Sequence, residues 1–342
     1  MKYNNVVIED YAYIDPPEVL TSDKLEELLE PIYTRLKLPH GRLELMTGIR
    51  SRGFWPNSTR PSSIATQAGE KLLEKLSKKG IQKRDINLLI NSSVCRDFLE
   101  PSTASVIHSN LEMPQSCSLF DISNACLGMI SGWEVVANMI ETGAIKRAII
   151  LSGENSAPLL ENTIKTLNED QTITRKSVKK FFANLTIGSA GVAYCLAHKS
   201  EAPNAPQITS IINRSDSTAN KLCQGDGNPE TLVMETDSEE LLKYGKALAK
   251  KTFEESQLKA NEIDIVIGHQ VGKAHKEVVL TELGLNKHQT FDTFDTLGNT
   301  GSAALPITLA KMNDEQGIEK GKKVALVGIG SGLSCSVLGV TW

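Results

Sequence analysis

The sequence predicts an α/β fold made of two copies of one unit, with mixed sheets that helices cover on both faces. Short runs of Ile, Val and Leu, typical of buried strands, alternate along the chain with longer amphipathic helices. Residues 81–94 align without gaps on residues 258–271. A strand and helix pattern that recurs in this way indicates a duplicated unit.

Other segments extend the repeat. An amphipathic helix is predicted before each aligned run, over residues 62–78 in the first copy and 238–256 in the second. The later strands also have counterparts, because residues 148–153 align on 324–329 and residues 189–198 on 332–341. Each copy is therefore predicted to run strand-helix-strand-helix-strand-strand.

The two copies suggest how the chain is divided. We expect a first half over residues 1–200 and a second over 201–342, with the Pro- and Ala-rich residues 202–206 as the linker. The first copy carries an insertion at about 155–187 that the second copy lacks. Insertions of that size are commonly lids, partner surfaces or substrate walls. The charged middle of this one also fits a tolerated surface excursion.

The composition is that of an ordinary globular protein. Of its 342 residues, 40% are hydrophobic and 23% charged, and the net charge is −4. No Lys/Arg block favours nucleic acid or an anionic membrane as partner. We recognise no signal peptide and no run of 18 apolar residues. The six scattered cysteines form no CxxC pair, which argues against a zinc site or a disulfide framework and predicts free thiols in the cytoplasm.

Cys126 is the leading candidate for a nucleophile. It ends a polar turn at 120–126, in front of an almost wholly apolar helix predicted over 127–140. The free N–H groups and positive dipole end of that helix would favour a thiolate and offer donors to a carbonyl attacked by the sulfur. The alternative is a small apolar residue at a helix start, as most cysteines are.

His269 and Asn299 are candidates from the second copy. His269 ends a predicted strand, as a base, a carbonyl-polarising donor or a hydrogen-bonded structural histidine. Asn299 can donate to a developing oxyanion or cap a helix. In the repeat alignment Asn299 falls within a residue or two of Cys126, and Ser92 falls on His269. If the halves pack about an approximate two-fold axis, thiol, imidazole and amide meet at one centre.

Two further places carry weaker signals. The glycine-rich residues 328–332 match no phosphate-loop pattern and open no helix, so we favour a tight turn in which Ser331 and Gly332 lend a backbone N–H to an oxyanion. Glu100 stands before Pro101 and a predicted helix. Its spacing alone favours a solvated carboxylate at a helix start.

Together these motifs resemble the thiolase superfamily, in particular its branch similar to ketoacyl-acyl-carrier-protein synthase III. Cys126 in SNACLG, His269 in GHQV and Asn299 in GNTGSAALP match the Cys-His-Asn triad of that family. Residues 94–102 and 124–128 most resemble the olefin-biosynthesis enzymes of this branch, which condense two fatty acyl-CoA molecules without decarboxylation. The resemblance implies a five-layered αβαβα fold, an obligate homodimer, CoA thioesters as substrates, and neither cofactor nor metal.

The resemblance also implies roles for the candidates. Cys126 would carry the acyl group as a thioester, and His269 and Asn299 would polarise the carbonyl of a second acyl-CoA. Glu100 would enter the site of the partner subunit as a base, because joining two unactivated thioesters requires removal of a weakly acidic α-proton. This reverses what its spacing alone suggests. The implied oxyanion hole consists of the backbone N–H groups of Cys126, Ser331 and Gly332.

Some positions depart from the family pattern and leave alternatives open. Gly272 and Ala274 stand where related synthases commonly have an asparagine and an arginine for the pantetheine arm and a CoA phosphate. Arg42 and Met46 replace the usual aromatic residue and arginine that hold adenine. An acyl-carrier protein therefore remains a second candidate donor. The other functions considered are a decarboxylating 3-oxoacyl-ACP synthase III that uses malonyl-ACP, and a catalytically silent thiolase-fold partner, which the complete triad disfavours.

Overall fold

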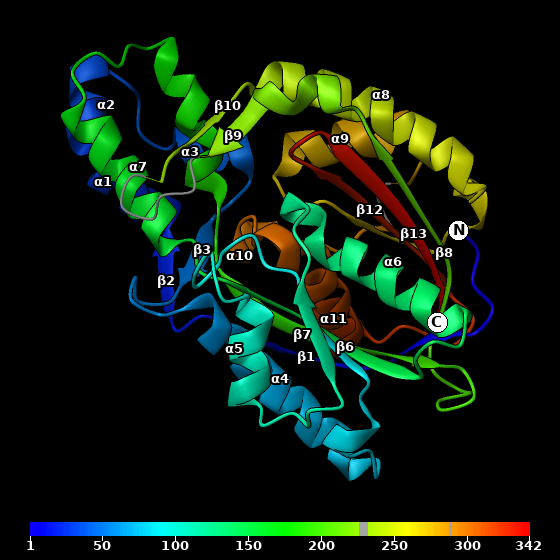
Figure 1. The fold of residues 1–342 in the computed structure, drawn as a ribbon. Helices are drawn as coiled ribbons and strands as arrows, with labels where there is room; N and C mark the ends of the chain where they lie inside the picture. Colours follow the sequence, from blue (N-terminus) through cyan, green and yellow to red (C-terminus); the bar gives the residue numbers. More distant parts are fainter. Residues whose placement is uncertain (226–231, 287–288) are drawn as a thin grey trace.

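The computed structural model describes residues 1–225, 232–286 and 289–342, which fold into alternating layers of helix and sheet (Figure 1). Two helices pack between the two halves of a large sheet, and other helices cover its two outer faces. The predicted five-layered αβαβα arrangement is confirmed. The helices of these layers are α4 (Pro61–Lys78) and α5 (Thr103–Asn110) outside the first half, α6 (Gly128–Glu141) and α11 (Ala304–Gln316) in the centre, and α8 (Ser238–Ser256) and α9 (Lys273–Glu282) outside the second half.

The described strands of this large sheet form one continuous order, β11-β12-β13-β8-β1-β7-β6-β4-β5. The halves meet where β1 pairs with β8 through a single residue pair, Val7 and Gln207. The two predicted sheets are therefore joined at a narrow seam. The strands are β1 (Val6–Ile14), β4 (Leu88–Asn91), β5 (Ser118–Asp121), β6 (Arg147–Glu154), β7 (Ala190–His198), β8 (Gln207–Ser215), β11 (Ile265–Gly268), β12 (Lys323–Gly330) and β13 (Ser334–Thr341).

The two halves share one strand topology. Strands β5-β4-β6-β7-β1 follow each other in the first half and β11-β12-β13-β8 in the second. Thr290 makes a parallel bridge to Val266 of β11, on the side that β5 occupies beside β4. The strands paired by the sequence repeat thus take equivalent places. Residues 202–206 lie between β7 and β8, and the exact boundary at residue 200 stays a prediction.

The two helices of the central layer are buried nearly all round, so most of their inward-facing side chains are apolar. Trp133 of α6 lies 4.7 Å from the ring of Tyr194 on β7, measured between centroids. The Tyr194 hydroxyl donates to the carbonyl of Pro306 at 2.8 Å, which ties β7 to α11. The helix predicted from residue 127 begins at Gly128 instead, after a 3₁₀ turn, η2 (Ala125–Leu127), that holds Cys126.

The insertion in the first half is a packed substructure. It contains α7 (Ala157–Glu169) and the 3₁₀ segment η3 (Ser177–Thr186), which share an apolar cluster with α1 (Ser22–Leu28) and α2 (Glu30–Leu36). Arg35 of α2 donates to the carbonyls of Leu167 and Ile173 at 3.1 and 3.0 Å. These contacts bury the apolar side of the insertion against the body of the protein, while most of its charged middle stays exposed.

Smaller elements complete the fold. None of the described helices is long and apolar enough to span a membrane. The ribbon of β9 and β10 packs near η3 beside the second half (Figure 1). The remaining named elements are β2 (Glu18–Thr21), β3 (Ser51–Phe54), α3 (Arg42–Thr47), β9 (Cys223–Gly225), β10 (Met234–Thr236) and α10 (Phe294–Leu297), with 3₁₀ turns η1 (Lys83–Asp85), η4 (Ser217–Leu222), η5 (Ala260–Glu262) and η7 (Gly301–Ala303).

The close packing of α4 on β6 yields a test of the fold. A Cβ atom at Gly153 would lie 2.2 Å from the carbonyl oxygen of Pro61 and 2.7 Å from the amide nitrogen of Ala65. Gly153→Ala should therefore push α4 away and lower the free energy of unfolding by about 1–3 kcal/mol. Gly225→Ala is the matched control, because its nearest neighbours lie at an ordinary 3.7 Å. Thermal unfolding with equal midpoints for both variants would contradict the packing.

Candidate active site

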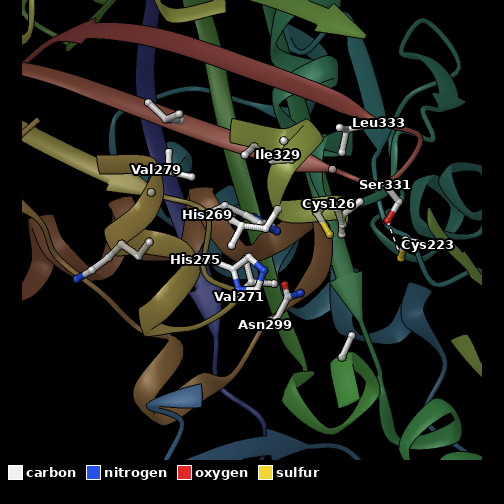
Figure 2. Close-up of a pocket in the computed structure, with 18 of the residues that line it drawn as sticks. Cys126, Cys223, His269, Val271, His275, Val279, Asn299, Ile329, Ser331 and Leu333 are labelled. Atoms are coloured by element: carbon white, nitrogen blue, oxygen red, sulfur yellow. Dashed lines mark hydrogen bonds between the residues drawn. The ribbon is translucent and has the colours of Figure 1, made fainter. Parts of the chain in front are cut away.

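An apolar pocket opens where the two halves meet, and it brings together side chains from both (Figure 2). Cys126 comes from the first half, and His269 and Asn299 come from the second. Ala183 and Thr186 of the insertion also line it, which identifies part of the insertion as a pocket wall. The rest of the wall is mostly aliphatic and comes from α8, α9, β11, β12 and the turn after β12, with Leu241, Leu242, Val266, Val279, Leu280, Leu283, Val327, Ile329 and Leu333.

Cys126 is held in place by the packing of its turn. The Met129 N–H, at the start of α6, donates to Ser302 Oγ at 2.8 Å. A Cβ atom at Gly128 would lie 2.5 Å from the carbonyl oxygen of Ser92, so only glycine allows the helix to approach β4 this closely. These contacts fix the first turn of α6, and with it the sulfur, against the second half.

The protonation of Cys126 differs from the sequence-based expectation. Burial raises the pKa of the thiol to about 12, and the nearby Cys223 and Glu154 act in the same direction. Hydrogen bonds to the sulfur from the Cys126 backbone and the Asn299 side chain lower the pKa, but by less. The expected thiolate is therefore wrong for this site, because desolvation outweighs these hydrogen bonds. Nucleophilic attack requires a base or a concerted proton transfer.

Asn299 is positioned by backbone contacts on both sides. Its N–H donates to the carbonyl of Thr186 at 2.8 Å, and its carbonyl accepts from the N–H of Gly188 at 2.9 Å. Its Oδ1 accepts from the N–H of Gly301 at 3.1 Å, which directs the amide NH₂ toward Cys126. Asn299 is not the N-cap of a helix, since Thr300 takes that place before η7.

His269 follows β11 and places a buried imidazole at the pocket. Its Nδ1 is buried and has no hydrogen-bond partner among the described residues. Burial lowers the pKa of His269 to about 4, and the neighbouring His275 adds to this effect. The next residue, Gln270, fixes the strand end, since its Oε1 accepts from the N–H groups of Thr293 and Phe294 at 2.8 and 3.0 Å. This argues against the structural-histidine alternative, because none of the described residues holds Nδ1 by a hydrogen bond.

The other predicted residues lie at or beyond the rim. Ser331 lines the pocket and donates from Oγ to the sulfur of Cys223 at 3.1 Å. Gly332 is exposed in the same turn and is not part of the pocket wall. Glu100 is exposed in the loop before α5 and lies outside the pocket of its own chain. The pocket thus joins Cys126, His269, Asn299 and Ser331, whereas Gly332 and Glu100 lie outside it.

The pocket also contains residues that the sequence analysis missed. His275 lines it from α9, and burial lowers the pKa of its imidazole. Its helical spacing with Val279 and Leu283 could have indicated a shared face. Cys223 comes from the irregular ribbon at β9, for which no sequence pattern gave a signal. Glu154, at the end of β6, is buried nearby.

The glycine that replaces the family asparagine has a steric reason. Gly272 has φ +137°, and a Cβ atom there would lie 2.8 Å from the carbonyl oxygen of Thr47. Arg42 and Met46, by contrast, are exposed on α3. No group of three or more potential metal-ligating side chains occurs within the described ranges.

The chain matches two family descriptions and several relatives. Residues 253–342 match the C-terminal domain of 3-oxoacyl-[acyl-carrier-protein] synthase III, and residues 120–169 match 3-oxoacyl-[acyl-carrier-protein] synthase III. The acyl-CoA:acyl-CoA alkyltransferases of Xanthomonas campestris and Shewanella oneidensis are 37% and 35% identical, over 100% of each chain. A β-ketoacyl-[acyl-carrier-protein] synthase III of Clostridium tetani is 28% identical, again over 100% of both chains.

Solved structures agree with these relatives. A cysteine-to-alanine variant of X. campestris OleA superposes with a TM-score of 0.94 at 36% identity, covering 100% of this chain and 98% of that one. A cysteine-to-serine variant with bound lauric acid and lauroyl-CoA gives a TM-score of 0.93 at 36% identity, covering 99% and 100%. With relatives this similar over its whole length, the chain belongs to the OleA-type acyl-CoA:acyl-CoA alkyltransferase family, within the ketoacyl synthase III-like branch of the thiolase superfamily.

Proposed function

We propose that this protein condenses two fatty acyl-CoA molecules, without decarboxylation, to a 2-alkyl-3-oxo fatty acid. The observation that carries the proposal is the meeting of Cys126, His269 and Asn299 at one end of a largely aliphatic pocket. Aliphatic walls suit an acyl chain, and the three polar groups supply a nucleophile, a proton acceptor and an oxyanion donor. The named activity of the two alkyltransferase relatives, and lauroyl-CoA in a related structure, support this substrate class.

In the first half-reaction, Cys126 Sγ forms a bond to the acyl carbon of one acyl-CoA, and CoA leaves as its thiol. The resting thiol holds its proton firmly and neutral His269 is a weak base, as their shifted pKa values indicate. We therefore expect the proton to move to the imidazole as the sulfur attacks, and then on to the departing CoA sulfur. The backbone N–H of Cys126 and one from the turn of Ser331 and Gly332 would stabilise the oxyanion.

In the second half-reaction, an α-proton of the second acyl-CoA must be removed. We assign that step to Glu100 of the partner subunit, with His269 and Asn299 donating to the enolate oxygen. The α-carbon then attacks the Cys126 thioester, the Sγ–C bond breaks, and the sulfur takes back a proton. Hydrolysis of the resulting 2-alkyl-3-oxoacyl-CoA gives the keto acid and free CoA.

The surface around Glu100 supports a homodimer as the active form. Leu99 is 93% exposed, and Val94, Phe98 and Phe120 are also exposed large apolar residues. Phe120 belongs to β5, an edge strand whose outer backbone groups are open to pairing. An apolar patch beside an open edge is typical of a buried interface. We propose that a second copy covers it, which would carry Glu100 across the boundary.

Crystal structures of a related enzyme support the role proposed for Glu100. Among crystal structures of X. campestris OleA are variants of one glutamate, one cysteine and one histidine. The glutamate precedes the cysteine there by the same number of positions as Glu100 precedes Cys126.

All six cysteines are free thiols, which agrees with a reducing cytoplasm as the location. The reaction needs no cofactor beyond the CoA thioesters.

The proposed activity can be tested with one substrate. Purified protein incubated with a long-chain acyl-CoA alone should form a 2-alkyl-3-oxo acid, identified by mass spectrometry as the acid or as the ketone left after loss of CO₂. Cys126→Ala should abolish the product. A parallel reaction with malonyl-ACP addresses the decarboxylating synthase. Product formation only when malonyl-ACP is present would favour that alternative over the proposed function.

Glu100 can be tested by separating the half-reactions. Glu100→Gln should acylate Cys126 at the normal rate but slow the condensation about 10²–10⁴-fold, because a carboxamide cannot take up the α-proton. Intact-protein mass and product assays report the two steps.

Mixing subunits shows whether Glu100 acts across the interface. When Glu100→Gln and Cys126→Ala chains are mixed and reassembled at random, about half of the dimers contain one chain of each kind. Each mixed dimer has one of its two sites with both groups intact, so about a quarter of the wild-type activity should return. No recovery, although mixed dimers form, would place Glu100 in its own subunit's site.

The raised pKa of Cys126 predicts how its reactivity depends on pH. A thiol with a pKa of about 12 stays protonated at neutral pH. Its alkylation by iodoacetamide should therefore accelerate about tenfold per pH unit from pH 7 to 10 without levelling off, because only the thiolate reacts. The Cys126→Ala protein corrects for the other five cysteines. A plateau at or below pH 8 would show that Cys126 is already a thiolate there.

A further inference from the structure

Glu154, at the end of β6, is a buried carboxylate to which the proposed mechanism gives no role. Only 1% of its surface is exposed. No lysine, arginine or histidine pairs with it among the residues that the structure describes. Burying an unpaired carboxylate is costly unless hydrogen bonds compensate it, and burial raises the pKa of Glu154 accordingly. The hydrogen bonds that Glu154 accepts therefore indicate what this carboxylate does.

One set of bonds holds the loop that leads to Glu100. The N–H groups of Val94 and Cys95 donate to Glu154 Oε1 and Oε2 at 2.8 and 3.0 Å. Ser93 Oγ accepts from the N–H of Gly153 at 2.9 Å, so the loop is fastened to the end of β6 at three successive residues. Glu100 follows five residues after the last of them.

A second bond holds the turn that carries Asn299. The Ser302 N–H donates to Glu154 Oε1 at 3.2 Å. Gly301 has φ +59°, and a Cβ atom there would lie 3.3 Å from the carboxylate, so the turn is pressed against Glu154. Ser302 Oγ in turn accepts from the Met129 N–H beside Cys126. The carboxylate therefore connects, directly or through one serine, the segments that carry Glu100, Asn299 and Cys126.

The number of donors explains why a carboxylate is needed. Three backbone N–H groups and the hydroxyl of Ser152, at 3.3 Å, converge on its two oxygens. A carboxylate is acceptor-only and can serve all of them. A glutamine offers one oxygen, and its NH₂ group would face one of the N–H donors. Removing an acceptor from buried donors costs more than the bond itself, so the attached segment should shift.

The charge on Glu154 argues against a role in activating the nucleophile. Its negative charge raises the pKa of the Cys126 thiol, which opposes formation of a thiolate. The other titratable groups in this region are Cys95, beside the carboxylate, and Cys223 and His269, in the pocket with Cys126. A carboxylate that hinders ionisation of the nucleophile is better explained by the geometry that it maintains.

We propose that Glu154 is a positioning residue for the condensation step, holding the Glu100 loop and the Asn299 turn in register around Cys126. The inference rests on the proposed function, because condensation is the step that requires both of these groups. Acylation depends mainly on Cys126, to which Glu154 is connected by hydrogen bonds only through Ser302. Disturbing Glu154 should therefore separate the two half-reactions.

Three variants test the proposal. Glu154→Gln removes the charge and one acceptor, and Glu154→Asp keeps the charge but shortens the reach. Glu26→Gln is the matched control, because Glu26 is also buried and accepts from the N–H groups of Gly41 and Leu43 at 2.6 and 2.8 Å, away from the pocket. Acylation of Cys126, condensation by the acylated enzyme, the pH profile of Cys126 alkylation and thermal stability are measured for each.

Glu154→Gln should slow condensation about a hundredfold and leave acylation within about threefold, because a small misplacement is enough to lose a near-attack geometry. Its Cys126 should alkylate about tenfold faster at a given pH, since a nearby negative charge is removed. Glu154→Asp should slow condensation with an unchanged alkylation profile, and it carries the test if Glu154→Gln does not fold. Glu26→Gln should lower stability alone.

Two outcomes would overturn the proposal. One is a Glu154→Gln or Glu154→Asp protein in which both half-reactions fall equally. The other is a Glu154 variant that behaves like Glu26→Gln. If the wild-type protein condenses acyl-CoA normally, either result refutes only the role of Glu154 and leaves the proposed function standing. Absence of condensation by the wild-type protein would instead refute the proposed function, and this inference with it.

Discussion

The site depends on one contact between the halves, where the start of α6 meets the turn at η7. The Met129 N–H donates to Ser302 Oγ, and Gly128 allows the helix to sit against the carbonyl of Ser92. This contact places the sulfur of Cys126 beside the amide of Asn299, although the two residues are far apart in sequence. A side chain at Gly128, or loss of the serine hydroxyl, would separate the two halves of the site before any reacting group was changed.

Burial decides the electrostatics of this site. Desolvation holds the Cys126 thiol and the His269 imidazole in their neutral forms, with pKa values moved in opposite directions. An apolar pocket with neutral polar groups at one end can take up a fatty acyl chain without stranding a charge beside it. Glu154 is the exception, and hydrogen bonds from three backbone N–H groups offset part of the cost of its burial. The chemistry proposed here therefore relies on protons that move during the reaction rather than on ions present at rest.

The cost of burying a charge also explains why Glu100 lies outside the pocket. A carboxylate inside an apolar pocket would lose its hydration, whereas on the surface it stays solvated until a partner covers it. The exposed Leu99 and the open edge of β5 form the surface that we propose a second copy covers. In the proposed mechanism assembly and activity are linked, since Glu100 would enter the site only when the apolar patch is buried.

The sequence alone determined the α/β class, the repeat and the triad, because each can be recognised from residue spacing, aligned segments and short motifs. The alternation of strands and helices predicted α4 and α8 closely, and the repeat alignment predicted that Cys126, His269 and Asn299 would meet. The neutral thiol, the pocket positions of Cys223 and His275, and the bonds of Glu154 were decided by the tertiary structure. They depend on burial and on contacts between residues distant in the chain. Local spacing could show only that His275 shares a helix face with Val279 and Leu283, and not that this face lines the pocket.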